Sequence, residues 1–302
     1  MSVVHPQTKR RIRQSLRRLI KLLCAIVLIS LAPGHAISVM APPFDITGFS
    51  VSGSTATLTW NGGNGPFQIQ SAPTAQGPFT NLGSPVDAQT TQVAASGSPT
   101  FYRVVAEQIA RYQVTFEAVW SPATHPINYP DDAHWSGLVG GTHNGSVTFW
   151  ELDAFATTGI KNMAEFGSQS ALLQEVSVAI EIGAAQTQLS GGGISGGSGS
   201  VSLTFDVSRD FPLVTLTSMI APSPDWFIGV NGKSLLENNH WVDSKVVPLY
   251  LHDAGTDAGP SYASPNQPQF PFAPITRISG FPALVNSEQK TFGTFTFTRI
   301  RD

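Results

Sequence analysis

Three aspartates lie at positions from which their carboxylates could bind a metal ion. Asp206 ends the strand-like run "VSLTFD", Asp225 lies in the corner "APSPDW" between two apolar runs, and Asp253 follows the run "VVPLYL". A hard cation such as Ca²⁺ takes six to eight oxygens from carboxylates, carbonyls and water. Loops at one end of a β-sandwich can supply them, because their carbonyls are not committed to a sheet. A calcium site is therefore one interpretation of these residues.

Turn capping is the other interpretation, since aspartates in loops often accept hydrogen bonds from nearby backbone N–H groups. Asp257 follows Asp253 after one short loop. Carboxylates that converge without a cation repel one another, which raises their pKa values. Spacing alone does not show convergence, so on spacing alone capping is favoured.

Residues 44–108 predict a small β-module, because short alternating runs are separated by Gly, Pro, Ser and Asn. Such a pattern is typical of a sandwich. The rhythm "LTW … FQIQSA … FTNLG … FYRV" loosely resembles fibronectin type III modules. The residues expected to fill its core are Trp60, Phe67, Ile69, Leu82, Val93, Tyr102 and Val104.

Residues 111–302 predict a larger antiparallel β-sandwich with inserted helices. In "YQVTFEAVW" the side chains of Val114, Phe116 and Ala118 share one face, and "FGTFTFTRI" alternates Phe with Thr. Helices are expected in "TTGIKNMAEFG" and "SQSALLQEVSVAIEIGAA", the second capped by Ser168 or Ser170. Its apolar stripe comprises Leu172, Val176, Ala179 and Ile180. The segment "SGGGISGGSGS" predicts a flexible loop without packing of its own.

Residues 1–36 have the pattern of a secretory signal, with a basic segment, the apolar run "LLCAIVLISLA" and the small residues of "GHA". Cleavage after Ala36 is expected, and a retained anchor is the alternative. The signal holds seven of the 17 Lys and Arg, which leaves ten bases against 20 acids. This acidic balance argues against nucleic-acid binding. The one cysteine, Cys24, lies in the signal, so the exported part forms no disulfide.

Other chemistry has weaker support. The histidines His125, His134, His143, His240 and His252 lack metal-site spacing, although His252 adjoins Asp253 and could cover a calcium site. The string "GISGG" has the spacing G-x-S-x-G, but it lies in the Gly-rich segment expected to be a loop, without the strand–turn–helix context of a nucleophile elbow. Glu151 with Asp153, or Glu165 with Glu175, could form a glycosidase pair, but the sequence does not give their separation. Aromatic residues such as Trp135, Trp150 and Tyr262 could contact glycans, but core positions are favoured for them.

The segments "SPDWFIGV", "LYLHDAGTDAGPSYASPNQP" and "ITRISG" resemble the spondin domain, the N-terminal domain of F-spondin and mindin. So do "FEAVWSPATHPINYP", "HWSGLVGGTH" and "GIKNMAEFG". The resemblance implies a C2-like β-sandwich that binds calcium through positions matching Asp206, Asp225 and Asp253. The first position is Glu in some relatives. The animal members carry cysteines and often thrombospondin repeats, whereas the mature part of this chain has no cysteine and no such repeat, so the family's adhesion partners transfer weakly.

These observations lead to one prediction. The protein is an all-β chain with a small β-sandwich module before a C2-like antiparallel β-sandwich with inserted helices. It is exported, remains at the cell surface or outside the cell, and has no membrane span in its mature part. It binds structural calcium through Asp206, Asp225 and Asp253, and it recognises an extracellular protein or glycan without catalysis. The alternatives are a secreted hydrolase and a calcium-dependent carbohydrate-binding module.

Overall fold

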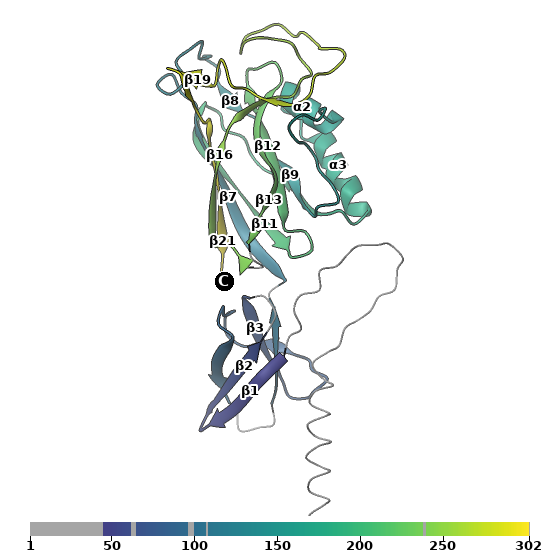
Figure 1. Cartoon of the computed structure of the whole chain (residues 1–302), viewed down its shortest axis with the longest axis vertical. Coiled ribbons are helices and arrows are strands. Elements are labelled where there is room, and N and C mark those ends of the chain that lie inside the picture. The colour runs from purple at the N-terminus through teal and green to yellow at the C-terminus, as the bar shows by residue number, and fades with distance from the viewer. Residues whose placement is uncertain (1–44, 62–64, 96–99, 107, 238–239, 302) are drawn as a thin grey trace, which may run out of the picture. The chain divides into compact units, whose positions relative to one another are not determined.

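The computed structural model describes residues 45–61, 65–95, 100–106, 108–237 and 240–301. The predicted secretory signal at residues 1–36 lies outside these ranges. The chain divides into two compact units, with the boundary between residues 107 and 108 (Figure 1). Each unit has its own core and is described by itself.

The first unit contains two three-stranded antiparallel sheets, with strand orders β1-β2-β5 and β4-β3-β6. Its strands are β1 (Asp45–Ser52), β2 (Thr55–Asn61), β3 (Phe67–Ala72), β4 (Thr80–Asn81), β5 (Thr90–Ala94) and β6 (Phe101–Ala106). Side chains from both sheets meet in one core. All seven predicted core residues belong to it, with Leu82, Val93 and Tyr102 partly buried at its margin. Alternation of apolar side chains along short strands therefore located this core correctly.

The second unit is built on two antiparallel sheets. Strands β11, β7, β21 and β16 form one, and β10, β9, β12, β13, β17 and β18 form the other, with β8 paired to β12. The first sheet consists of β7 (Ile109–Val119), β11 (Ser198–Ser208), β16 (Ser244–Leu249) and β21 (Gly293–Ile300). The second consists of β8 (His134–Trp135), β9 (Val139–His143), β10 (Ala185–Ser190), β12 (Leu213–Ala221), β13 (Trp226–Ser234), β17 (Leu251–Asp253) and β18 (Thr276–Arg277). Two short hairpins add β14 (Leu236–Glu237) with β15 (His240–Trp241), and β19 (Leu284–Val285) with β20 (Glu288–Gln289).

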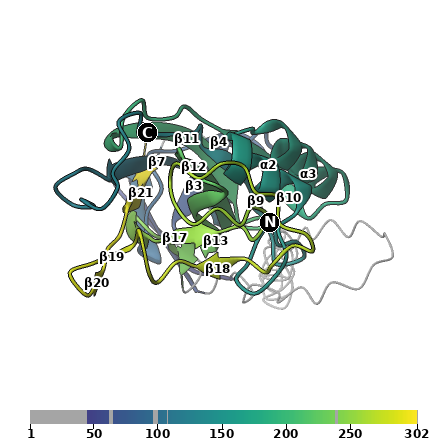
Figure 2. The ribbon, with the colours of Figure 1, turned by 90° about the horizontal axis from the view of Figure 1, so that it is seen from above.

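The second unit is a three-layer structure. The two sheets face each other across a core in which Phe116, Phe295 and Phe297 of one sheet share a cluster with Leu216 and Ile228 of the other. A second core lies between the larger sheet and the helices α2 (Thr158–Phe166) and α3 (Ser170–Glu181). Figure 2 shows the two helices side by side along one side of this unit. The predicted β-sandwich with inserted helices is confirmed.

Both predicted helices form, but the cap of the second differs from the prediction. Helix α3 begins after Gln169, and neither Ser168 nor Ser170 provides a capping side chain. In its stripe Leu172, Val176 and Ala179 are buried, while Ile180 remains 36% exposed. The Glu175 carboxylate of α3 instead accepts hydrogen bonds from Gly159 N and Thr157 Oγ1, at the start of α2.

The segment "SGGGISGGSGS" is packed, contrary to the prediction of a free loop. Ile194 is 8% exposed, and its backbone exchanges two hydrogen bonds with Trp135. Ser198 then begins β11. Glycine permits this close approach, because a Cβ at Gly193 would lie 2.3 Å from the carbonyl oxygen of Trp135. Here composition indicated flexibility, whereas the backbone pairs with a neighbouring segment.

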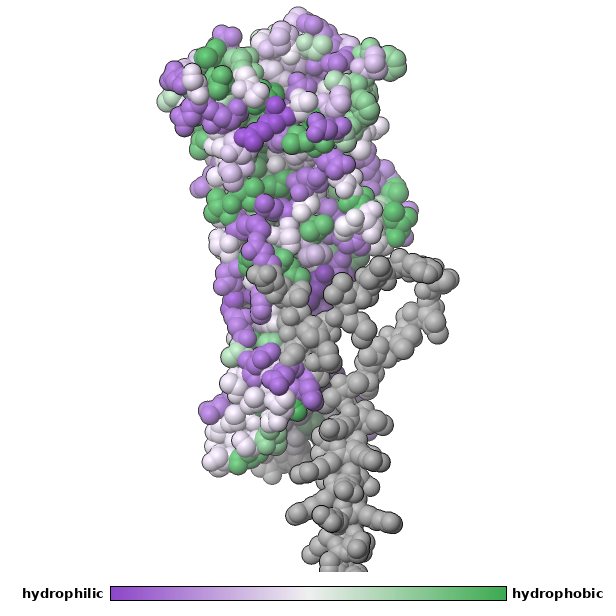
Figure 3. Space-filling view, in the orientation of Figure 1, coloured by the Kyte–Doolittle hydropathy of each residue, from purple (hydrophilic) through white to green (hydrophobic). Residues whose placement is uncertain are grey.

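The described residues contain no helix that is both long and apolar enough to cross a membrane. The face of the second unit seen in Figure 3 mixes hydrophilic and hydrophobic residues.

Candidate metal centre

Asp225 lies in the turn that joins β12 to β13, at one end of the larger sheet. The hydroxyl of Ser223 fixes this turn, because it donates to Ile220 O and accepts from Trp226 N. Strand β13 pairs with β17 so that Trp226 lies opposite Asp253. This register places the two aspartates, which are 28 positions apart in the chain, at the same end of the sheet.

The Asp225 side chain is fully buried, and its two oxygens differ. Oδ2 accepts hydrogen bonds from Thr256 N at 2.7 Å, Asp257 N at 3.0 Å and Thr256 Oγ1 at 3.2 Å. Oδ1 is buried without a hydrogen-bond partner among the described residues. A buried carboxylate oxygen of this kind is costly unless a cation or another donor satisfies it.

The tripeptide Asp-Ala-Gly occurs twice in "DAGTDAG", and each copy forms the same local turn. Asp253 Oδ1 accepts from Gly255 N, and Asp257 Oδ1 accepts from Gly259 N, both at 2.8 Å. The second oxygen of Asp257 also accepts from Gln267 N at 3.0 Å. Turn capping and convergence are therefore both realised, because Asp253 caps its turn and still lies beside Asp225.

Asp225 and Asp253 lie in surroundings that disfavour their ionised form. Burial, followed by the charge of Asp253, raises the pKa of Asp225 to about 7 despite the opposing hydrogen bonds from Thr256 and Asp257. Burial also raises the pKa of Asp253, and the charge of Asp257 adds to this effect. Among the described residues, no ion pair with Lys, Arg or His involves any of the three.

A hollow of about 390 Å³ opens beside Asp253. Its lining residues are Trp226, Asp253, Asp257, Ala258, Gly259, Pro260, Gln269, Ile278 and Phe281. Asp225 is not part of this wall and so lies on the inner side of the cluster. The indole N–H of Trp226 makes no hydrogen bond of ordinary geometry within the described structure. Its interaction with the Asp253 carboxylate nevertheless acts to lower the pKa of Asp253.

Asp206 lies elsewhere in the unit. It is on β11 of the smaller sheet, opposite Arg111 of β7, whose guanidinium donates to its two oxygens at 2.8 and 3.1 Å. Trp135 pairs with Ile220 near the Asp225 turn and with Ile194 just before β11 begins. Asp206 is near the other end of β11, so the structure brings together two of the three predicted acids and not the third.

His252 does not cover the site. Successive side chains of a strand point to opposite faces, and His252 packs between Trp150 and Phe227, at ring distances of 5.0 and 5.4 Å. Burial, followed by the charge of Arg277, lowers its pKa to about 4. The neutral ring is therefore part of the core between the sheet and the helices.

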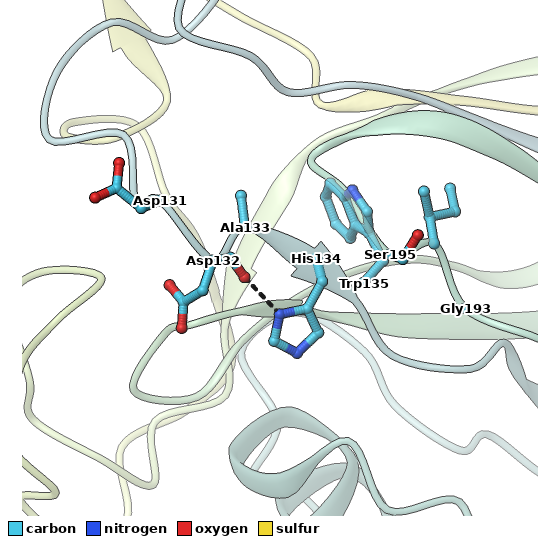
Figure 4. Close-up of a pocket in the computed structure, with 8 residues that line it drawn as sticks. Asp131, Asp132, Ala133, His134, Trp135, Gly193 and Ser195 are labelled. Atoms are coloured by element: carbon cyan, nitrogen blue, oxygen red, sulfur yellow. Dashed lines mark hydrogen bonds between the residues drawn. The ribbon is translucent and has the colours of Figure 1, made fainter.

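A second hollow of about 560 Å³ is lined by Asp131, Asp132, His134 and the segment Gly193–Ser195 (Figure 4). His134 Nδ1 bonds to the backbone oxygen of Asp132 at 2.7 Å. The Asp131 carboxylate points away from the His134 ring (Figure 4). These side chains do not converge on one point.

The donor set around Asp225 fits a hard cation better than a soft one. Across the described part of the chain, no three acidic, histidine or cysteine side chains are placed to hold a metal by themselves. Asp225 Oδ1 and the Asp253 oxygen not bonded to Gly255 are the available carboxylate donors. Backbone carbonyls and water would complete the shell, which calcium accepts and zinc does not favour.

Sequence reasoning did not assign roles to Gly255, Thr256 and Asp257. Gly255 has φ +74°, and a Cβ there would lie 2.1 Å from the carbonyl oxygen of Ala273. Thr256 and Asp257 supply the donors to Asp225. The repeated Asp-Ala-Gly tripeptide was the available signal, since Asp followed two residues later by a backbone donor is a known turn.

The comparisons with known proteins identify the family of this chain. The family model described as Spondin_N matches residues 110–294. Spondin-2 of Rattus norvegicus is 34% identical over 178 residues, which cover 58% of this chain and 54% of that protein. Spondin-1 of Homo sapiens is 35% identical over 178 residues, which cover 56% of this chain and 22% of that protein.

The matched segment spans about half the length of Spondin-2 and a smaller share of Spondin-1. It coincides with the second compact unit and includes the turn of Asp225 and both Asp-Ala-Gly turns. Since the family model matches more than half of the chain, this protein belongs to the spondin domain family.

Proposed function

We propose that this chain is an exported, non-catalytic adhesion or recognition protein whose spondin domain binds calcium at Asp225 and Asp253. The observation that carries the proposal is Asp225 Oδ1, a fully buried carboxylate oxygen without a hydrogen-bond partner in the described structure. Family membership supports a role in adhesion, and an extracellular protein or glycan is the partner class. The chain binds neither nucleic acid nor, in its mature part, the membrane interior.

The role proposed for calcium is structural. Asp225 Oδ2 holds the backbone of Thr256 and Asp257, and Asp253 begins the same connection between β17 and β18. A cation between the two carboxylates would remove their repulsion. It would thereby stabilise the native state by mass action, since the unfolded chain does not hold the acids together.

Calorimetric titration of the purified chain with calcium tests the site. The wild type is expected to bind one ion, and Asp225→Asn and Asp253→Asn are expected to lose at least about tenfold in affinity, because each removes a charged donor. Asp206→Asn is the matched control and keeps wild-type affinity. If the wild type binds no calcium, or if only Asp206→Asn weakens binding, the proposed site is wrong.

The hydrolase alternative has less support. In one of the two proposed acid pairs both carboxylates make structural contacts, because Glu165 pairs with Lys161 and Glu175 caps α2. The alternative of a calcium-dependent carbohydrate-binding module has more support, since a hollow adjoins the proposed ion. Turnover assays on esters and glycosides would test the first alternative.

A further inference from the structure

The hollow beside Asp253 is the open side of the proposed calcium site. Asp225 is fully buried behind it, whereas Asp253 and Asp257 contribute to its wall. Both Asp257 oxygens accept backbone N–H groups. Two free carboxylate oxygens fill only part of a shell of six to eight donors. A ligand in the hollow could supply others, and its assignment rests on the proposed function because it presupposes the bound ion.

The charge of the site disfavours an anionic ligand. Calcium would balance the charges of Asp225 and Asp253, and Asp257 would leave an excess negative charge. Arg277 does not compensate it, because this residue pairs with His252 on the opposite face of β17 and stacks on Tyr250 at 3.3 Å. A carboxylate in the hollow would therefore meet a negative potential, whereas neutral oxygen donors would not.

Part of the lining of the hollow is apolar. Ile278 and Phe281 are partly buried, and the Phe281 ring contacts Trp226 with ring centres 6.3 Å apart at 70°. Gln269 adds a carboxamide to the lining. A ligand that fits this surface carries neutral oxygens on one side and C–H groups on the other.

We infer that the hollow binds a neutral vicinal diol on a saturated ring, which is the chemistry of an uncharged sugar. The hydroxyls face the calcium site, and the ring contacts Ile278 and Phe281. Gln269 donates to or accepts from a ring hydroxyl. Nothing in this inference requires catalysis.

The test uses NMR of the ¹⁵N-labelled full chain, following the indole N–H of Trp226 and the backbone amides of Ile278 and Phe281. Calcium is added first, and its effect on these signals tests the metal site alone. The probes are then cis-1,2-cyclohexanediol, methyl α-mannopyranoside and methyl β-galactopyranoside. Cyclohexanol and acetate are the matched controls, which respectively lack the diol and carry a charge.

At least one diol probe is expected to shift these signals in the calcium-loaded chain only, and neither control is. Gln269→Ala should weaken that binding about fivefold, the equivalent of one hydrogen bond. It should leave calcium affinity unchanged. Gln267→Ala, an exposed neighbour outside the hollow, should change neither.

Several results would overturn the inference while leaving the calcium site intact. These are calcium binding without any diol response, diol binding without calcium, or an equal response to acetate. An absence of any calcium response would instead refute the proposed function, and with it the basis of the inference.

Discussion

Replacing Asp225 by asparagine should have opposite effects on the metal-free and the calcium-bound protein. In the folded chain the pKa of Asp225 is about 7, against 3.8 for an unperturbed aspartate. The folded state therefore binds a proton more strongly than the unfolded state, and stability falls as pH rises from about 4 to about 7. At pH 8 the ionised side chain costs roughly 4 kcal/mol, from 1.36 kcal/mol for each pKa unit.

Asparagine removes this charge and retains an oxygen that can accept from Thr256 and Asp257. Neutral acceptors are weaker than charged ones, so about 2 kcal/mol is lost across these hydrogen bonds. The amide NH₂ replaces an oxygen that has no hydrogen-bond partner among the described residues. The net expectation is a metal-free variant more stable than the wild type by about 1–2 kcal/mol at pH 8, or about 2–8 °C in melting temperature for a domain of this size.

Calcium should reverse the order. At a hundred times the wild-type Kd, calcium stabilises the wild type by about 2.7 kcal/mol, and it stabilises a variant that binds a hundredfold more weakly by only about 0.4 kcal/mol. Differential scanning fluorimetry at pH 5 and pH 8, with calcium and with chelator, measures all four cases. At pH 5 the metal-free difference should largely vanish, because the wild-type side chain is then protonated. A metal-free variant that melts well below the wild type at pH 8 would refute this reasoning.

Three further predictions concern the second unit. Burial and the charge of Lys290 lower the pKa of His125 to about 4. The folded state therefore binds fewer protons than the unfolded state, and stability falls as pH drops from 6.5 to 4. In urea unfolding, His125→Phe should remove up to about 3 kcal/mol of that loss of stability. Gly255→Ala should lower calcium affinity at least about tenfold in calorimetry, because the left-handed backbone and the contact with Ala273 forbid a Cβ. Phe295→Ala should cost about 3–5 kcal/mol in chemical unfolding, because its ring is fully buried between the sheets.

Two of these three predictions have a matched control variant. Thr296→Ala, on the outer face of the same strand as Phe295, should change stability by less than about 0.5 kcal/mol. Gly280→Ala has open space for its Cβ and no left-handed backbone, so it should leave calcium affinity unchanged. For His125, an unaltered dependence of stability on pH in the variant would mean that other groups cause the loss of stability at acid pH. Equal effects in a variant and its control would contradict the corresponding structural argument.

The strands and the cores could be predicted from the amino-acid sequence alone. Alternation in "FGTFTFTRI" and "YQVTFEAVW" predicted which side chains are buried, because a strand exposes its two faces in turn. The motifs around Asp225 and Asp253 identified the family. The burial pattern and the family motifs are both local features, so they can be recognised in one amino-acid sequence.

The meeting of the acids depends on tertiary structure. Asp206 ends a strand-like run as the other two do, but its strand belongs to the other sheet and pairs it with Arg111. Asp225 and Asp253 meet because β13 pairs with β17 in a register that places Trp226 opposite Asp253. Packing likewise ordered the Gly-rich segment and, within the described part of the chain, left one Asp225 oxygen without a hydrogen-bond donor. Strand register, sheet membership and burial arise from contacts between distant segments, so no local pattern could specify them.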